Sequence, residues 1–368
     1  MIKRLIYIFA SSNINKPFTL YLRIYNNIVE KVSIKDIAQK VGVSIATVSL
    51  VLNGKEKGGK GGRVGEDMAE KIRQAAKEMH YEPNHLARGL RMGRSQTIGL
   101  VVADISNSFF AHLAFHIQEQ AEKYDYGVII TNTNESDLKM EKMMNVLKSR
   151  QVDGFIVIPT ENGEPYVSDL LKRNIPVVLV DRNFSDLNVC SVLVDNYNAS
   201  KEAVKSLVMQ GCKNIGFVTY KSSLQHVLDR RNGYVDALKE AGIYNSALIK
   251  EVDYSLVLYD VGIAIESLLS KENNIDGIFF ATNTLSMMGI KRLMDLNINI
   301  PSDIKVVCFD KSEVFDFIDI PIPYIQQPIS EMGKNAVELL MEIIKNKTIE
   351  SKSVKLKAYL MNNPISFY

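Results

Sequence analysis

Long apolar runs are missing from this chain of 368 residues. None approaches the ~18 consecutive apolar residues that a membrane-spanning helix needs, so the sequence predicts no membrane segment. Cysteine is scarce, and Cys190, Cys212 and Cys308 show neither metal-ligand spacing nor a disulfide framework, which favours a reducing cytoplasm. The composition, 46 % hydrophobic and 23 % charged, is typical of globular proteins, and the length predicts two or three domains.

The motifs of several enzyme classes are also absent. The sequence contains no G-x-x-x-x-G-K-[ST] or G-x-G-x-x-G run to cradle a phosphate, and no G-x-S-x-G turn for a nucleophilic serine. His112 and His116 are four residues apart, but the segment HLAFH lacks the glutamate of zinc hydrolases. We therefore predict no catalytic residue, no metal site and no cofactor.

Positive charge is concentrated near the N-terminus of the chain. Residues 1–95 hold 17 Lys/Arg and 8 Asp/Glu, whereas the remaining 273 hold 27 and 34. A basic head on an acidic body is what nucleic-acid binding by the head requires. Chance variation of surface charge is the alternative.

The first 32 residues fit no targeting class. MIKRLIYIFASS begins with basic residues, but its apolar core, residues 5–10, is shorter than the about 7 to 15 residues of a signal peptide. We interpret residues 1–32 as an extension that is poorly ordered or weakly helical, or as a start site assigned too early. No internal Met precedes Met68, so a later start would need another codon.

Three short helical patterns follow in residues 33–82. Ser33 is an N-cap candidate before Ile34, Ile37, Ala38 and Val41, and Gly42 ends that helix. Ser44 begins a second helix that ends before Gly54, and a third apolar stripe runs from Met68 to Met79. Two helices around a tight turn, backed by a third, predict a helix-turn-helix DNA-binding domain. A three-helix bundle that docks another protein has the same pattern.

In a helix-turn-helix, the second helix enters the major groove of DNA. Thr47 and Ser49 can bond phosphates or base edges, whereas Ile45, Ala46 and Leu50 can contact only thymine methyls or sugar edges. A short helix with Arg88, Arg91 and Arg94 follows from Pro83. The predicted DNA-binding residues are Ser44, Ile45, Ala46, Thr47, Ser49, Leu50, Asn53, Lys55, Asn84, Arg88, Leu90 and Arg91.

Three segments carry a specific resemblance: SIKDIAQKVGVSIATVSLVLNG from Ser33, YEPNHLARGLRMGRSQTIGLVVADISNSFF from Tyr81, and VDGFIVIP from Val152. Together they resemble the LacI/GalR family of ligand-controlled transcription repressors over about nine-tenths of the chain. The resemblance implies that residues 83–95 form a hinge helix, ordered when two subunits meet on the operator. It also implies that Leu90 wedges into the minor groove, where an apolar wedge bends the duplex. Packing of Leu90 against the body is the alternative.

The sequence departs from the family at two places in the head. Leu50 stands where the family commonly has a hydrogen-bonding residue, often Arg, so a bidentate base contact is lost. The family also has a shorter loop than KEKGGKGGR at 55–63. Its basic residues could supply unspecific phosphate contacts, or the loop could be merely solvated. Both departures affect which operator is read.

From Thr97 onward, strands and helices alternate, as in a parallel α/β fold. Expected strands lie at 98–102, 127–131, 154–158, 176–180, 191–194, 214–219, 277–280 and 304–309. Expected helices lie at 109–124, 137–149, 164–173, 196–209, 228–241, 256–270, 283–296 and 329–345. We predict two parallel-sheet lobes, as in periplasmic binding proteins: about 96–194 with a C-terminal crossing segment, and about 195–325 with the C-terminal end.

Polar residues stand where several expected strands end. Asp104, Asp181, Asn283 and Asp310 would lie in a cleft between the lobes, where such folds bind ligands, although Asp and Asn also cap helices routinely. Carboxylates and amides beside aromatic rings suit a hydroxyl-rich ligand such as a sugar or nucleoside. The family resemblance implies effector contacts at Phe109, Phe110, Asp181, Arg230, Asn283, Asp310 and Gln327.

These observations predict an all-α helix-turn-helix head and hinge joined to an α/β body at residues 96–368. The expected function is that of a cytoplasmic, homodimeric transcription regulator, most simply a repressor, that binds operator DNA and a small effector. No leucine heptad follows Ser351, so we expect no tetramer through a C-terminal coiled coil. The alternative is a secreted sugar-binding transport protein with an unrelated basic head.

Overall fold

The computed structural model describes residues 32–54, 64–81, 94–317, 320–346 and 350–361. Their contacts divide the chain into two units, 1–88 and 89–368. We call the described part of the first unit the head and the second unit the body. Residues 1–31, 55–63 and 82–93 lie outside the described residues, and with them most of the predicted extension (1–32) and hinge helix (83–95) and the whole insertion at 55–63.

The head contains three helices, α3 (Ile34–Val41), α4 (Ile45–Leu52) and α5 (Glu66–Glu78). Ser33 caps α3 in a reciprocal capping box with Asp36, and Gly42 ends it with φ 77°, which glycine adopts without strain. The apolar stripes meet in one small core around Ile37, Val48 and Ile72, each fully buried. The predicted head helices are therefore confirmed, with a tight turn of Gly42–Ser44 between the first two.

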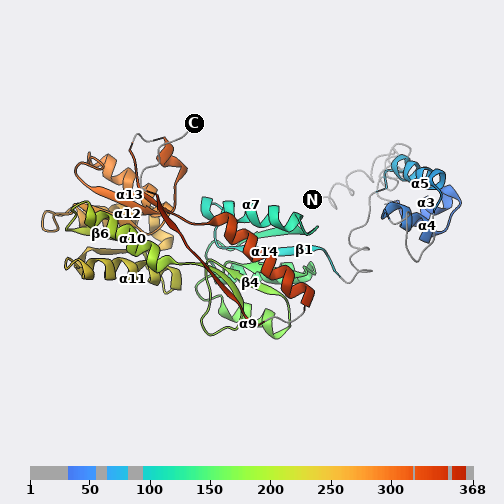
Figure 1. Cartoon of the computed structure of the whole chain (residues 1–368), viewed down its shortest axis with the longest axis horizontal. Helices are drawn as coiled ribbons and strands as arrows, with labels where there is room; N and C mark the ends of the chain where they lie inside the picture. The colour runs from blue at the N-terminus through green and yellow to red at the C-terminus, as the bar shows by residue number, and fades with distance from the viewer. Residues whose placement is uncertain (1–31, 55–63, 82–93, 318–319, 347–349, 362–368) are drawn as a thin grey trace, which may run out of the picture. The chain divides into compact units, whose positions relative to one another are not determined.

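The body consists of two α/β lobes, each built on a six-stranded sheet (Figure 1). The sheet of lobe 1 is parallel throughout and has the order β11-β5-β4-β3-β1-β2. Its elements are β1 (Thr97–Val102), α7 (Ser108–Glu122), β2 (Gly127–Asn132), α8 (Asp137–Ser149), β3 (Gly154–Val157), α9 (Glu164–Lys172), β4 (Val177–Val180), β5 (Cys190–Val194), α14 (Ile329–Asn346) and β11 (Ser353–Leu356).

Lobe 2 has the sheet order β12-β10-β9-β8-β6-β7, in which only β12 runs antiparallel, to β10. Its strands are β6 (Ile215–Tyr220), β7 (Ile249–Val252), β8 (Gly277–Phe280), β9 (Lys305–Phe309), β10 (Tyr324–Gln326) and β12 (Tyr359–Met361). Its helices are α10 (Asn196–Met209), α11 (Gln225–Glu240), α12 (Val257–Leu268) and α13 (Asn283–Asp295), with the 3-10 turns η1 (Ser246–Leu248), η2 (Tyr254–Leu256) and η3 (Glu313–Asp316).

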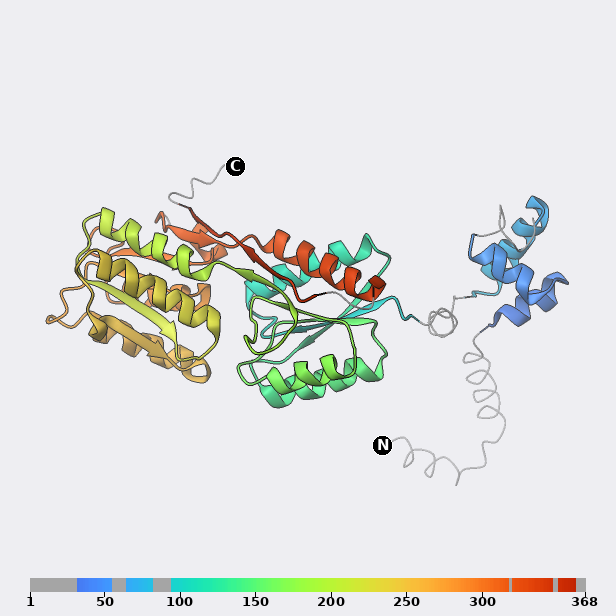
Figure 2. The same ribbon diagram turned by 60° about the horizontal axis from the view of Figure 1, so that its bottom comes forward.

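Helices cover both faces of each sheet (Figure 2). In lobe 1, Ile98, Leu100 and Val102 of β1 pack with α7 and α14, whereas Val101 belongs to the cluster that includes α8 and α9. Strands buried on both faces must be apolar at every position, which explains the continuous hydrophobic runs that predicted them. The predicted fold class is thereby confirmed.

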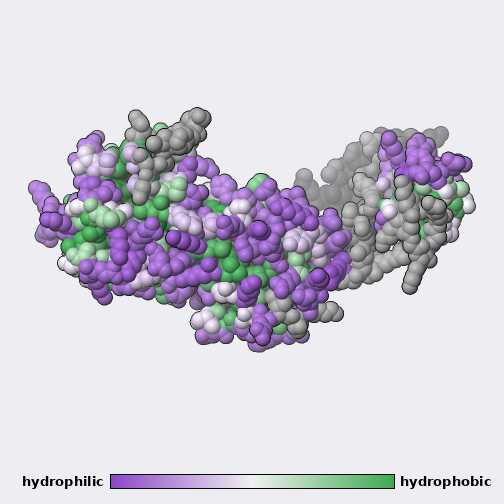
Figure 3. Space-filling model, in the orientation of Figure 1, coloured by the Kyte–Doolittle hydropathy of each residue, from purple (hydrophilic) through white to green (hydrophobic). Residues whose placement is uncertain are grey.

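The chain passes between the lobes at several points. It enters lobe 2 after β5, returns to lobe 1 after β10 to form α14 and β11, and crosses again to β12. The sequence analysis missed β7, β10, β11 and β12, which have only three or four residues and include edge strands. The face of the body in Figure 3 is largely hydrophilic, and no described helix is long and apolar enough to cross a membrane.

Candidate functional site

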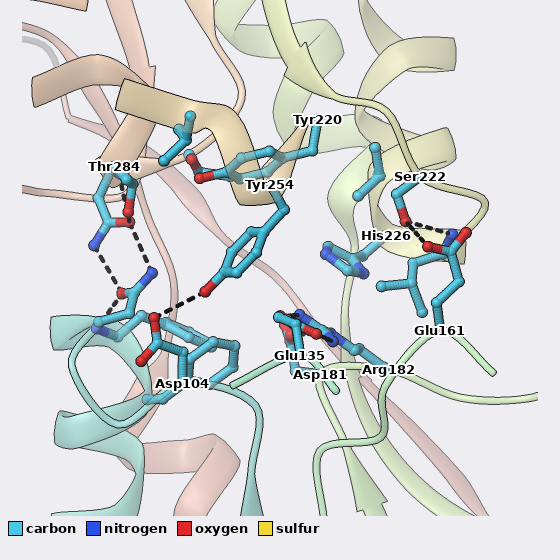
Figure 4. A pocket seen from close by; sticks show the side chains of 18 of the residues that line it. Asp104, Glu135, Glu161, Asp181, Arg182, Tyr220, Ser222, His226, Tyr254 and Thr284 are labelled. Carbon is cyan, nitrogen blue, oxygen red and sulfur yellow. Dashed lines mark hydrogen bonds and ion pairs between the residues drawn. The ribbon is translucent and has the colours of Figure 1, made fainter. Parts of the chain in front are cut away.

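A cavity of about 520 Å³ lies between the two lobes of the body. Its walls come from the loops that follow β1, β2, β3 and β4 in lobe 1 and β6, β7, β8, β9 and β10 in lobe 2, together with α7 and α11 (Figure 4). These loops meet because carboxyl ends of parallel strands share one edge of a sheet. All the predicted effector residues line this cavity: Phe109, Phe110, Asp181, Arg230, Asn283, Asp310 and Gln327.

Asp181 and Asp310 occupy equivalent positions in the two lobes. Each follows a central strand, β4 or β9, and each has a left-handed backbone, with φ 68° and 71°. Each backbone N–H donates to the neighbouring strand, Asp181 to Val192 O (2.9 Å) and Asp310 to Ile325 O (3.0 Å). A non-glycine residue in this region is strained by about 1 to 3 kcal/mol, and such strain concentrates at binding sites. The sheets thus hold both carboxyls against the cavity at a conformational cost.

Arg230 brings a buried guanidinium from α11 into the same cavity. Its Nε donates to Asn196 Oδ1 (2.8 Å) and its Nη1 donates to Ala281 O (2.7 Å). The guanidinium lies over the Phe309 ring, 3.6 Å from the ring centre. A planar cation held on both an aromatic face and fixed acceptors is preorganised, because little side-chain freedom remains to be lost on binding.

Burial and neighbouring charges shift the pKa values of Asp310, Asp181 and Arg230 in opposite directions. Burial raises the pKa of Asp310 to about 6, while Arg230 and the Gln327 amide, which donates to Asp310 Oδ1 (2.7 Å), pull that pKa downward. Burial likewise raises the pKa of Asp181 and lowers that of Arg230. Removing charged groups from water disfavours their ionised forms. The cavity therefore gathers one buried guanidinium and two acidic groups, Asp181 and Asp310.

Sequence reasoning missed a second buried cation, Arg182. It forms a bidentate pair with Glu135, at 2.6 Å and 2.8 Å, and also donates to Pro159 O (2.9 Å). Glu135 is 47 residues away, so no local pattern could reveal the pair. Arg182 directly follows the predicted Asp181, and this position in the sequence could have indicated that it lines the cavity.

His226 was also missed. It lies one helical turn before Arg230 on α11, so its i, i+4 spacing to a predicted residue could have indicated it. Its side chain projects into the cavity in Figure 4. Burial, with Arg182 and Arg230 nearby, holds the pKa of His226 well below its usual value. His226 is therefore neutral and offers a hydrogen bond without a charge.

Four polar atoms around the cavity have no hydrogen-bond partner among the described residues: Asp181 Oδ1, Gln327 Oε1, His226 Nδ1 and Arg182 Nε. Arg182 Nε lies 3.8 Å from Asp181 Oδ2, an ion-pair distance but not a hydrogen bond. A buried polar atom without a partner costs about 1 to 3 kcal/mol. Their gathering around one cavity indicates a site built to bond a polar ligand.

Hydrogen bonds across the cleft join the lobes around the cavity (Figure 4). Asn107 and Asn283 exchange two side-chain bonds, at 3.0 Å and 3.3 Å. Tyr254 donates its hydroxyl to Asp104 (2.9 Å), and Ser223 donates its backbone N–H to Glu161 (2.6 Å). These contacts join the two lobes beside the cavity.

The strand-end residues divide between capping and cleft roles. Asp104 accepts bonds from Ser106 in its own loop and from Tyr254 across the cleft, so the local and cleft interpretations both apply. Asp181 and Asp310 cap no helix, and Ser312 caps η3 instead. Within the described ranges, no group of three or more His, Cys, Asp or Glu residues could hold a metal ion.

In the head, α4 carries the predicted base-reading residues. Ser44 caps the helix, with its Oγ accepting from Thr47 N (3.1 Å), and Asn53 ends it. Ile45, Ala46 and Asn53 are exposed, while Thr47, Ser49 and Leu50 are half-buried. Lys55, Asn84, Arg88, Leu90 and Arg91 lie outside the described residues.

Comparison with known proteins agrees with both units. A family model described as bacterial regulatory proteins, lacI family, matches residues 33–84. Another, described as periplasmic binding proteins and sugar binding domain of LacI family, matches residues 95–364. The second match alone covers more than half of the chain.

Individual relatives match along most of their length. The chain is 33 % identical to catabolite control protein A of Priestia megaterium over 329 residues, 88 % of this chain and 96 % of that protein. It is 30 % identical to the ribose operon repressor of Halalkalibacterium halodurans, over 89 % and 95 %. The Lac repressor dimer bound to operator and the anti-inducer ONPF shares the fold, with a TM-score of 0.79 at 19 % identity over 91 % of this chain and 98 % of that one. This chain therefore belongs to the LacI family of bacterial regulatory proteins.

Proposed function

We propose that this protein is a cytoplasmic transcription repressor whose binding to operator DNA is controlled by a sugar or nucleoside. The observation that carries the proposal is the cavity between the lobes, where Asp181, Arg230 and Asp310 converge in a chain that also has a helix-turn-helix head. A secreted transport protein would have no use for such a head, and the match of residues 33–84 to lacI-family regulators argues against it. We assign no catalytic role.

The cavity chemistry supports a neutral, hydroxyl-rich effector. Arg182 and Arg230 can donate to ligand oxygens, whereas Asp181 and Gln327 can accept from ligand hydroxyls. Phe109 and Phe110, with ring centres 5.1 Å apart in an edge-to-face arrangement, offer an apolar surface to a sugar ring or base. Family structures include a CelR–cellobiose complex and a regulator with bound ribose, so sugars of different sizes fit this fold.

The effector acts by preferring one arrangement of the lobes. A ligand that bonds both lobes stabilises the closed state and shifts the population only by its difference in affinity for the two states. In our proposal, residues 33–82 bind DNA and the hinge at 83–95 couples the head to the body at 96–368. Asn84, Arg88, Leu90 and Arg91 contact the operator there, as the family resemblance implies. A homodimer presents two heads to a near-palindromic operator.

Two measurements on the full-length chain test this function. A thermal-shift screen of sugars and nucleosides identifies the effector, because a ligand at 100 times its Kd adds about 2.7 kcal/mol of stability. Duplexes selected from a random library are then titrated with and without that effector at several salt concentrations. We expect sequence-selective binding, a steep loss of affinity with salt, and a change in affinity when the effector is added. A flat salt dependence together with no selected sequence would contradict the proposal.

Effector affinity should fall in acid. A hydroxyl that donates to Asp310 requires the carboxylate, and burial raises the pKa of this group to about 6. We therefore expect Kd to rise as the pH falls below 6, approaching about tenfold per pH unit. Titration calorimetry between pH 5 and 8 measures this, and Asp310→Asn should weaken binding at pH 7 and flatten the profile. An unchanged Kd from pH 8 to 5 would exclude the bond to Asp310.

The same pKa gives stability the opposite trend. The folded pKa of Asp310, about 6, exceeds the unfolded value of ~3.9, so the folded protein binds more protons between these pH values. The contribution of Asp310 to the free energy of unfolding of the ligand-free protein should therefore decrease as the pH rises from about 4 to 6. Affinity and apo stability thus respond to this one carboxyl in opposite directions.

A further inference from the structure

The exposed surface of the recognition helix is apolar. α4 has the sequence IATVSLVL, without a charged side chain. Val48 and Val51 are buried in the core of the head, while Ile45 is 52 % exposed, Ala46 is exposed and Leu50 is half-buried. Ile45 and Ala46 therefore offer an apolar surface at the start of the helix, where a partner molecule can contact them.

The polar side chains of α4 and its caps bond one another. Ser44 Oγ and Thr47 Oγ1 are 2.9 Å apart, a hydrogen-bond distance. Asn53 Nδ2 donates to Ser49 O (2.6 Å) and Ser49 Oγ (3.3 Å). Reading a base edge with these groups would require exchanging bonds already made, so the net gain would be small. The apolar side chains have no such competing interaction.

Most of the basic residues in the N-terminal part of the chain lie outside the described helices. The described residues of the head, 32–54 and 64–81, contain five Lys/Arg and five Asp/Glu. The segments at 1–31, 55–63 and 82–93 contain 11 Lys/Arg and 3 Asp/Glu. Attraction to phosphates is therefore expected from these segments, and the three-helix fold contributes little net charge to it.

These three observations, together with the proposed function, determine what α4 can recognise. In the major groove, the only apolar feature of a base edge is the C5-methyl group of thymine. We propose that α4 selects its operator half-site through thymine methyl groups, with Ile45, Ala46 and Leu50 as the specificity-determining residues. The basic segments supply affinity that depends on salt, and the methyl contacts supply selectivity that does not. The inference rests on the proposed function, because it requires α4 to enter the groove.

The test removes single methyl groups from DNA. Duplexes selected by the full-length protein from a random library are synthesised with each thymine replaced in turn by uracil, which lacks only the methyl. At the contacted positions of each half-site we expect a three- to fivefold loss of affinity per methyl, from the value of one buried methyl group. The loss should be the same at low and high salt, whereas total affinity falls with salt.

Variants assign the contacts. We call the loss of affinity on replacing a thymine by uracil the uracil penalty. Ile45→Ala and Leu50→Ala should each abolish this penalty at particular thymines, while the unfolding temperature of the protein stays the same. Leu138→Ala, which changes an equally apolar exposed residue on α8 of the body, should retain the wild-type penalty. A Leu50→Ala variant with the full penalty everywhere would overturn the assignment to Leu50.

Selected duplexes that bind equally well with uracil at every position would overturn the inference and leave the proposed function standing. Failure to select any duplex would instead overturn the proposed function, and the inference with it. The two failures are therefore distinguishable in one experiment.

Discussion

Arg230→Ala should abolish the thermal stabilisation of this protein by its effector. The guanidinium is buried and fixed by Asn196, Ala281 and Phe309, whereas Arg182, the second buried cation of the cavity, is already paired with Glu135. Truncating one partner in a buried, charge-assisted contact costs about 2 to 5 kcal/mol of binding free energy. A loss of that size raises Kd by a factor of roughly 30 to several thousand. Thermal shift and calorimetry with the screened effector measure it.

The adjacent Arg231 provides the matched control. Its side chain is about 40 % exposed and pairs with Glu251 at the surface of lobe 2. Exposed pairs contribute little, roughly 0 to 1 kcal/mol, so Arg231→Ala should bind the effector as the wild type does. Equal loss in both variants would indicate damage to α11 and not loss of a ligand contact. Full effector affinity in Arg230→Ala would remove Arg230 from the proposed site.

The Arg230→Ala variant should also change the titration of its neighbours. Arg230 opposes the rise of the pKa of both Asp310 and Asp181. Without the cation these carboxyls should titrate at higher pH, which NMR of side-chain carboxyl carbons can follow. An unaltered titration would show that the positive charge of Arg230 is not felt by them.

Gly233→Ala should strongly destabilise lobe 2. Gly233 is in α11, where a Cβ would collide with the backbone of α10 at Tyr197 O and Lys201 N. The backbone of a helix cannot yield as a side chain can, so α11 must move away from α10. We expect a loss of about 3 kcal/mol in the free energy of unfolding, at the upper end for overpacking. Denaturant unfolding monitored by circular dichroism measures it.

Gly262→Ala is the control for this change. Gly262 is also helical, in α12, but an added Cβ would meet no atom within 4 Å. Alanine favours a helix over glycine by up to about 1 kcal/mol, so this variant should be equally stable or more stable. Because Arg230 lies one turn before Gly233, the displaced helix in Gly233→Ala should also weaken effector binding. A neutral Gly233→Ala would mean that the two helices tolerate a wider separation.

The sequence was sufficient to predict the central strands of both sheets and several of the residues that line the cavity. Strands such as Val177–Val180 are buried on both faces, which forces an apolar run, and a parallel sheet brings the ends of such runs together. That rule, with the family resemblance, led to Asp181 and Asp310. Their backbone strain was not predictable, because nothing in the sequence states the φ of an aspartate.

Long-range pairs could not be predicted for a different reason. Tyr254 and Asp104 are 150 residues apart in sequence, and their bond exists only because two lobes close on each other. The short strand β10 was missed because three residues give too little pattern to separate a strand from a loop. Helix α11 begins at Gln225, three residues before the expected start at 228. His226 is therefore helical, although the predicted helix did not include it.

The return of the chain to lobe 1 has a consequence for synthesis. Lobe 1 is completed by α14 and β11, so its buried core includes Met332, Ala336 and Leu340 from the last tenth of the protein. During translation, residues 95–194 therefore emerge from the ribosome long before α14 and β11 have been synthesised, and lobe 2 emerges in the interval. During that interval the first lobe lacks one helix and one edge strand, so apolar surface that α14 later covers stays exposed, and such surface is prone to aggregation.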